Sequence, residues 1–143
     1  MIDNRIAIEQ ASNEKNEYEM IQDLSYSAFL FFENQDITVK MISLCKFIKL
    51  SDMISVALAS ENIESIEDMD KANETAITLD EYTNRNKILM TNTIKMLLVD
   101  KYNLDDDTVP QVLSEVLNMV IDNSDISIED VNKYINDKFK LEL

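Results

Sequence analysis

Residues 108–121 have the sequence TVPQVLSEVLNMVI, and this stretch decides the fold class of the chain. Threonine followed three residues later by glutamine is a capping box, and proline is tolerated in the first turn of a helix. Steps of three and four residues, which place side chains on one helical face, separate Val112, Val116, Met119 and Val120. Three more apolar residues widen this face, namely Leu113, Leu117 and Ile121. An apolar face of this width predicts a helix at the centre of a helical core.

Other segments on both sides of this stretch show helical patterns of apolar residues. Thr78 with Glu81 forms a second capping box, and Ser127 stands directly before the last apolar stripe. We predict further helices over residues 16–32, 43–58 with Ser43 as the cap, 78–102 and 127–139. Residues 62–71 carry apolar side chains at threefold spacing, which predicts a short helix or a 3₁₀-rich loop.

One segment favours a strand. Residues 37–41, with the sequence ITVKM, alternate apolar and polar side chains with a period of two. A single strand needs a second strand to pair with, and residues 25–31 are the only candidate for that second strand. We therefore predict a mainly α fold, a single compact domain of about five helices with at most one marginal short strand pair. The domain is expected to span residues 16–143, and residues 1–15 are expected to fray.

The composition excludes several classes of site. The chain has 143 residues, no glycine, one proline and no histidine. Phosphate-cradling loops and dinucleotide-binding fingerprints depend on glycine, and Ser–His–Asp or Cys–His catalysis depends on histidine. Cys45 is the single cysteine, so one chain cannot form a disulfide or a multi-cysteine zinc site. Its apolar neighbours favour a buried structural thiol over a nucleophile.

The many carboxylates do not form a recognisable metal or catalytic motif. Asp105, Asp106 and Asp107 lack the glycine and the ligand spacing of a calcium loop, and they precede a helix whose dipole favours negative charge. Pairs such as Glu64 and Asp68 arise by chance among 28 acidic residues, in polar stretches without sign of a pocket. We expect a protein that is not an enzyme, with no catalytic, metal or cofactor residues.

The net charge of −15, from 13 basic and 28 acidic residues, opposes binding to nucleic acid or anionic membrane. Residues 61–84 carry eight acidic residues and one basic residue, whereas residues 85–104 carry four basic residues and one acidic residue. The strongest surface feature is an acidic cluster formed by Glu61, Glu64, Glu67, Asp68, Asp70 and Glu74. This cluster is either a solvated helix face or a surface that binds a basic partner. In one form of the second alternative, the carboxylates mimic the phosphates of a nucleic acid.

Eight methionines offer flexible side chains that suit either an irregular core or an adaptable binding groove. Four of them lie in the apolar patterns and are assigned to the core: Met41, Met69, Met96 and Met119. The core is also expected to contain the run Phe29–Phe32, which is apolar on all sides of a helix. The N-terminus shows no secretory signal, and no apolar run approaches the length of a membrane span. These features predict a cytoplasmic protein.

Two stretches carry a resemblance to a known family. The first is residues 37–50, and the second runs from Ile94 through the junction Leu104-Asp105-Asp106 to Leu117. Together they resemble tail assembly chaperones of long-tailed bacteriophages, which are small, acidic, mostly helical non-enzymes with a short strand. The missing glycine departs from that family. The resemblance implies transient binding to tape-measure and tail-tube proteins, and it transfers no catalytic residue.

We therefore expect a non-enzymatic, acidic protein–protein interaction factor, a chaperone or an inhibitor of a host or phage protein. Its partner would be a protein with a basic surface or an exposed apolar segment. The sequence is also compatible with a homodimer. The alternative is a nucleic-acid mimic that inhibits a DNA- or RNA-binding protein. A hydrolase that uses carboxylates alone would need an acidic pair with raised pKa in a cleft.

Overall fold

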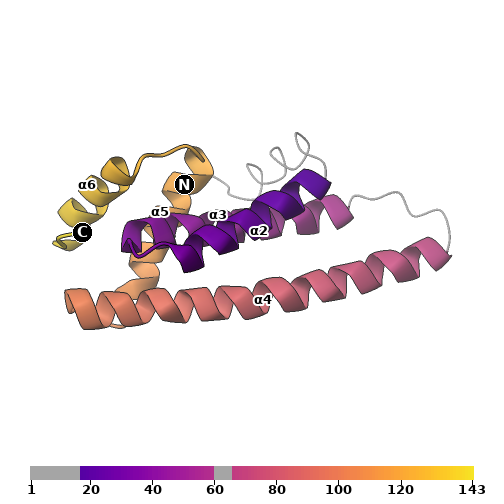
Figure 1. The fold of residues 1–143 in the computed structure, drawn as a ribbon, viewed down its shortest axis with the longest axis horizontal. Coiled ribbons are helices and arrows are strands. Elements are labelled where there is room, and N and C mark those ends of the chain that lie inside the picture. Colours follow the sequence, from indigo (N-terminus) through magenta and orange to yellow (C-terminus); the bar gives the residue numbers. More distant parts are fainter. Residues whose placement is uncertain (1–16, 60–65) are drawn as a thin grey trace.

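The computed structural model describes the backbone of residues 17–59 and 66–143, and the side chains of residues 19–56 and 78–143. These residues form five helices and no strand (Figure 1): α2 (Glu17–Glu33), α3 (Ile37–Ala59), α4 (Ile66–Tyr102), α5 (Val109–Asp122) and α6 (Ile128–Phe139). The predicted mainly α fold of about five helices is confirmed. The predicted fraying of residues 1–15 lies outside the described residues.

The central helix is α3. It packs against α2, α4, α5 and α6, and it runs back along α2 after a short connection (Figure 1). Its side chains are buried on almost every side, including Met41, Leu44, Phe47 and Ile54. A helix that is apolar all round is expected to be buried in this way. The sequence had favoured residues 108–121 for the centre, but α5 has one buried face and packs onto α3.

The predicted strand over residues 37–41 is wrong, because this segment is the first turn of α3. The Asp36 carboxylate accepts hydrogen bonds from the backbone N–H groups of Thr38, at 2.8 Å, and Val39, at 3.2 Å. Asp36 therefore caps the helix, and its carbonyl accepts the Lys40 amide. The period-two pattern carried no strand information, because both faces of α3 are buried. Ser43, the predicted cap, lies buried within the helix.

The predicted break before Thr78 is also wrong. α4 runs without interruption from Ile66, so it joins residues 66–71 of the first predicted segment to the predicted segment 78–102, and residues 62–65 lie outside the described residues. Nothing between these residues stops a helix, because neither glycine nor proline occurs there. The predicted end is confirmed: Asn103 adopts a left-handed conformation with φ 55°, and the Leu104 amide donates to the Leu98 carbonyl at 3.2 Å. Asparagine tolerates this conformation, so it ends the helix without glycine.

The last two helices lie where the sequence predicts them. Thr108 precedes α5, although its side chain makes no capping hydrogen bond. Asp105, Asp106 and Asp107 are exposed in the connection before that helix. Ser127 caps α6 by accepting the Asp130 amide at 3.1 Å, which confirms the predicted cap.

α6 is held against the start of α3 by polar and apolar contacts. The Thr38 hydroxyl donates a hydrogen bond to the Asn132 side chain, and Val131 and Ile135 are fully buried. The helix ends at Lys140, which adopts a left-handed conformation with φ 58°. All five helices thereby contribute to one hydrophobic cluster.

Two predicted core assignments are wrong in part. Of the run Phe29–Phe32, Phe31 is fully buried, whereas Phe29 and Phe32 are exposed, because one face of α2 packs on α3. Met96 is exposed on α4, while Met41 is buried as predicted. Met119 is partly buried, and Met69 lies outside the described side chains. No helix in the described part of the chain has the length and apolar content to cross a bilayer.

Candidate partner-binding surfaces

The predicted acidic cluster, Glu61, Glu64, Glu67, Asp68, Asp70 and Glu74, lies outside the described side chains. Residues 66–74 belong to the first turns of α4, whereas residues 61–65 lie outside the described backbone as well. The predicted partner surface therefore stays a prediction. The described side chains present other surfaces, which the sequence did not locate.

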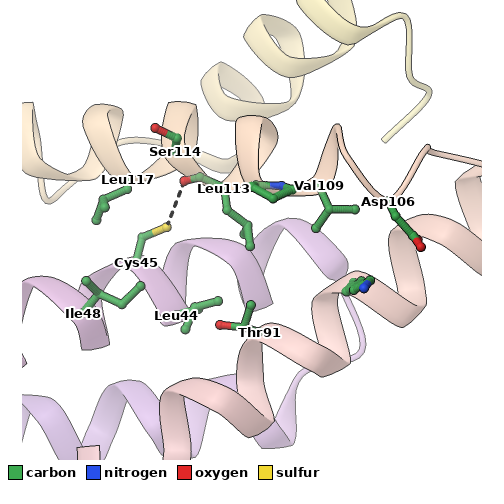
Figure 2. A pocket seen from close by; sticks show the side chains of 11 residues that line it. Leu44, Cys45, Ile48, Thr91, Asp106, Val109, Leu113, Ser114 and Leu117 are labelled. Atoms are coloured by element: carbon green, nitrogen blue, oxygen red, sulfur yellow. Dashed lines mark hydrogen bonds between the residues drawn. The ribbon is translucent and has the colours of Figure 1, made fainter. Parts of the chain in front are cut away.

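An apolar groove opens between α3, α4 and α5 (Figure 2), with a volume of about 360 Å³. We call it the α3–α5 groove. Its lining consists of Leu44, Cys45, Ile48, Thr91, Lys95, Asp106, Val109, Pro110, Leu113, Ser114 and Leu117. The lining is largely apolar, and its two charged residues, Lys95 and Asp106, are both exposed.

The wide apolar face of α5 creates this groove. Its valines at 109, 112, 116 and 120 are buried and hold the helix on α3. Leu113 and Leu117 project beside that buried face and remain half-exposed, and so does Ile48 on α3. The α4 side of the groove carries the polar side chains of Thr91 and Lys95. Apolar surface is therefore left open to solvent, in a concave shape that suits a ligand or a peptide.

Cys45 lies in the floor of the groove, but its chemistry is structural. Its thiol donates a weak hydrogen bond to the Leu113 carbonyl, with a sulfur–oxygen distance of 3.8 Å (Figure 2). Burial raises the pKa of the Cys45 thiol far above its ordinary value, because a desolvated thiolate is unfavourable. The thiol is therefore unreactive, and the predicted buried cysteine is confirmed.

The described carboxylates show no pair of the kind that a hydrolase would need. None of them is fully buried, and no group of three cysteine or acidic side chains within the described ranges could hold a metal ion. Desolvation raises the pKa of Asp52, an effect that Lys87 partly offsets. Asp52 is an exposed side chain, so this pKa shift reflects partial desolvation and involves no second carboxylate.

Two further surfaces expose large apolar side chains. On α2, Ile21, Tyr26, Phe29 and Phe32 lie outside the core, and the rings of Tyr26 and Phe29 stack with centroids 6.5 Å apart. On α4, the exposed apolar residues are Tyr82, Ile88, Leu89 and Met96. Contiguous exposed apolar patches are typical of protein-binding surfaces, and the stacked rings of Tyr26 and Phe29 form an exposed apolar contact of this kind. The sequence contains a sign of the exposed apolar surface on α2, because a run such as Phe29–Phe32 has more apolar side chains than one helix face can bury.

No known protein family, curated protein or solved structure matches this chain.

Proposed function

We propose that this chain is a non-enzymatic protein-binding factor that acts in the cytoplasm as a chaperone or an inhibitor. The observation that carries the proposal is the α3–α5 groove, whose half-exposed Leu113, Leu117 and Ile48 line an open apolar concavity. Helix-in-groove binding uses apolar anchors of an amphipathic helix at spacings of three, four and seven residues. The occupant is an amphipathic segment of another protein.

The charge of the chain indicates the chemistry of that segment. A net charge of −15 attracts a basic partner and repels an acidic one during association. Asp106 lines the groove together with Lys95, and Asp105 and Asp107, next to Asp106 in the sequence, are exposed. We therefore propose an occupant with apolar anchors on one face and lysine or arginine on the other. The resemblance to tail assembly chaperones makes a phage tape-measure or tail-tube protein the first partner to test.

The first experiment measures binding of a synthetic amphipathic peptide with leucine on one face and lysine on the other. A matched peptide with glutamate in place of lysine is the charge control. Fluorescence anisotropy should show binding of the lysine peptide and much weaker binding of the glutamate peptide. Equal affinity for the two peptides, or no binding of either, would contradict the proposal.

The groove is tested by the substitution Leu117→Asn, which keeps the branched shape of the side chain and removes the apolar anchor. Leu89→Asn on α4 is the matched control, because Leu89 is exposed and lies outside the groove lining. We expect Leu117→Asn to weaken peptide binding about tenfold, the effect of losing one apolar contact. Leu89→Asn should bind like the wild type. Circular dichroism establishes that both variants remain folded before the comparison is made.

A second candidate function is the nucleic-acid mimic, in which the chain occupies the basic site of a DNA- or RNA-binding protein. The exposed carboxylates and the net charge of −15 favour it. Salt distinguishes the two functions, because screening weakens an interface built on charge and leaves apolar contacts. A partner released by moderate salt, with affinity unchanged by Leu117→Asn, would favour the mimic over groove binding.

A further inference from the structure

The exposed face of α4 has the pattern of a helix-pairing seam. Thr83, Met90, Ile94 and Leu98 form its buried face. At about 100° per residue, Tyr82, Leu89 and Met96 lie roughly 140° around the helix from Met90, Ile94 and Leu98. Their exposed fractions are 42% for Tyr82, 52% for Leu89 and 64% for Met96. Figure 1 shows α4 along one edge of the molecule, with the other helices on one side of it.

The spacing of these three residues is seven, which is the heptad repeat of coiled coils. The positions three residues after each of them complete the seam, and they are Arg85, Asn92 and Val99. Ile88, at 63% exposed, adds apolar surface along one flank. We call these seven residues the α4 seam.

We propose that the α4 seam binds the α4 seam of a second copy of this chain, with the two helices antiparallel. In the proposed register, Tyr82 faces Asn92 of the second copy, and Leu89 faces Arg85, whose aliphatic stem packs on the leucine. The two helices then overlap over residues 72–102, a length of about 46 Å. None of the seven seam residues lines the α3–α5 groove.

Charge complementarity argues for the antiparallel orientation. Within the overlap, residues 72–84 carry three acidic residues and no basic residue, whereas residues 85–102 carry four basic residues and one acidic residue. In the proposed antiparallel register, residues 72–84 of each copy lie along residues 90–102 of the other, which carry two basic residues and one acidic residue. A parallel pair would instead lay like charges side by side, which is repulsive.

One flank of the seam fixes the register. Glu81, Ile88 and Lys95 occupy this flank at intervals of seven residues, and all three are exposed. In antiparallel pairs such a flank faces the same flank of the partner in reverse order. Glu81 of each copy therefore meets Lys95 of the other, and Ile88 meets Ile88. A shift by one heptad would set Ile88 beside Lys95 and lose both contacts.

The polar residues on the other flank already have hydrogen-bond partners within α4. The Asn86 side chain donates to the Tyr82 carbonyl at 2.9 Å, and the Thr93 hydroxyl donates to the Leu89 carbonyl at 2.8 Å. These hydrogen bonds stay within α4, so they survive when water leaves the seam. Tyr82 lies at the edge of the seam nearest to α3, where its ring packs against Phe47 with ring centroids 6.2 Å apart.

Sedimentation equilibrium of the full chain over a range of concentrations tests the proposal. The wild type should form dimers, and Ile88→Asp should raise the dimer dissociation constant about tenfold or more, because two carboxylates then meet at the seam. Phe29→Asp on α2 is the matched control, since Phe29 is also exposed and lies on another helix. An equimolar mixture of Ile88→Asp and Ile88→Lys should dimerise again. A monomeric wild type, equal weakening by Ile88→Asp and Phe29→Asp, or a mixture that stays monomeric would overturn the proposal.

Cysteine cross-linking tests the orientation without relying on a destabilised variant. Ile88→Cys should form a disulfide with a second copy of itself under mild oxidation. Met96→Cys should cross-link to itself poorly, because Met96 faces Thr78 of the second copy in the antiparallel pair and Met96 in a parallel pair. A high yield for Met96→Cys with a low yield for Ile88→Cys would indicate a parallel pair and overturn the proposal. The wild type is the background control, because its single thiol, Cys45, is buried.

Discussion

Replacing Asp36 with alanine removes the N-cap of the central helix. The Asp36 carboxylate accepts the amides of Thr38 and Val39 at 2.8 and 3.2 Å, so two N–H groups lose their acceptor. Loss of an aspartate N-cap costs about 0.5–2 kcal/mol, and loss of the negative charge at a helix N-terminus is part of that cost. Since α3 packs against every other described helix, local fraying is transmitted to the whole fold. We expect the free energy of unfolding to fall by about 1–2 kcal/mol.

Urea unfolding followed by circular dichroism measures this loss, with Asp36→Asn as the matched control. Asparagine keeps an acceptor at the cap and removes the charge, so it should cost about half as much or less. An Asp36→Ala variant whose stability stays within about 0.5 kcal/mol of the wild type would match an ordinary surface substitution. That result would refute the conclusion that Asp36 starts α3 and that residues 37–41 are helical.

Two further predictions concern side-chain chemistry. Burial raises the pKa of the Cys45 thiol and shields it from solvent. A thiol reagent at pH 8 should therefore modify Cys45 in the native protein at least about a hundredfold more slowly than in the urea-unfolded chain. Comparable rates would show that the Cys45 thiol in the α3–α5 groove is accessible to solvent. The hydrogen bond from Lys138, at 2.5 Å, lowers the pKa of Glu115 below its ordinary value of 4.5. A lowered folded-state pKa stabilises the fold above the unfolded value, and the contribution is lost as pH falls through the folded value. As the pH falls below about 4.5, the free energy of unfolding of the Glu115→Gln variant should therefore decrease less than that of the wild type. Urea titrations at several pH values measure this difference, and the same pH dependence for both proteins would contradict the Lys138–Glu115 contact.

The sequence predicts the helices best where polar caps and apolar periodicity agree. Ser127 and the stripe that follows it locate α6, and residues 108–121 locate α5. The strand at residues 37–41 was predicted wrongly because a helix that is buried on all sides loses its amphipathic period. The cap at Thr78 was predicted wrongly because a threonine–glutamate pair is also compatible with a helix interior. Local chemistry alone does not distinguish these cases.

The candidate site depends on tertiary structure to a greater extent. The width of the apolar face of α5 could be read from the sequence, but it was interpreted as the sign of a central helix. That Leu113 and Leu117 stay half-exposed follows from how α4 and α5 sit on α3, which no local pattern encodes. The exposed rings of Phe29 and Phe32 likewise depend on which face of α2 meets α3.

The most direct test of the proposed function is a methyl NMR titration of the full chain with the lysine-containing amphipathic peptide. Groove binding predicts saturable shifts that are largest for Ile48, Leu113 and Leu117, which line the α3–α5 groove. The methyl groups of Ile21 on α2 and Leu89 on α4 serve as internal references, because both are exposed and lie outside the groove lining. Shifts that are largest at Ile21 or Leu89, or that vanish at moderate salt, would contradict groove binding.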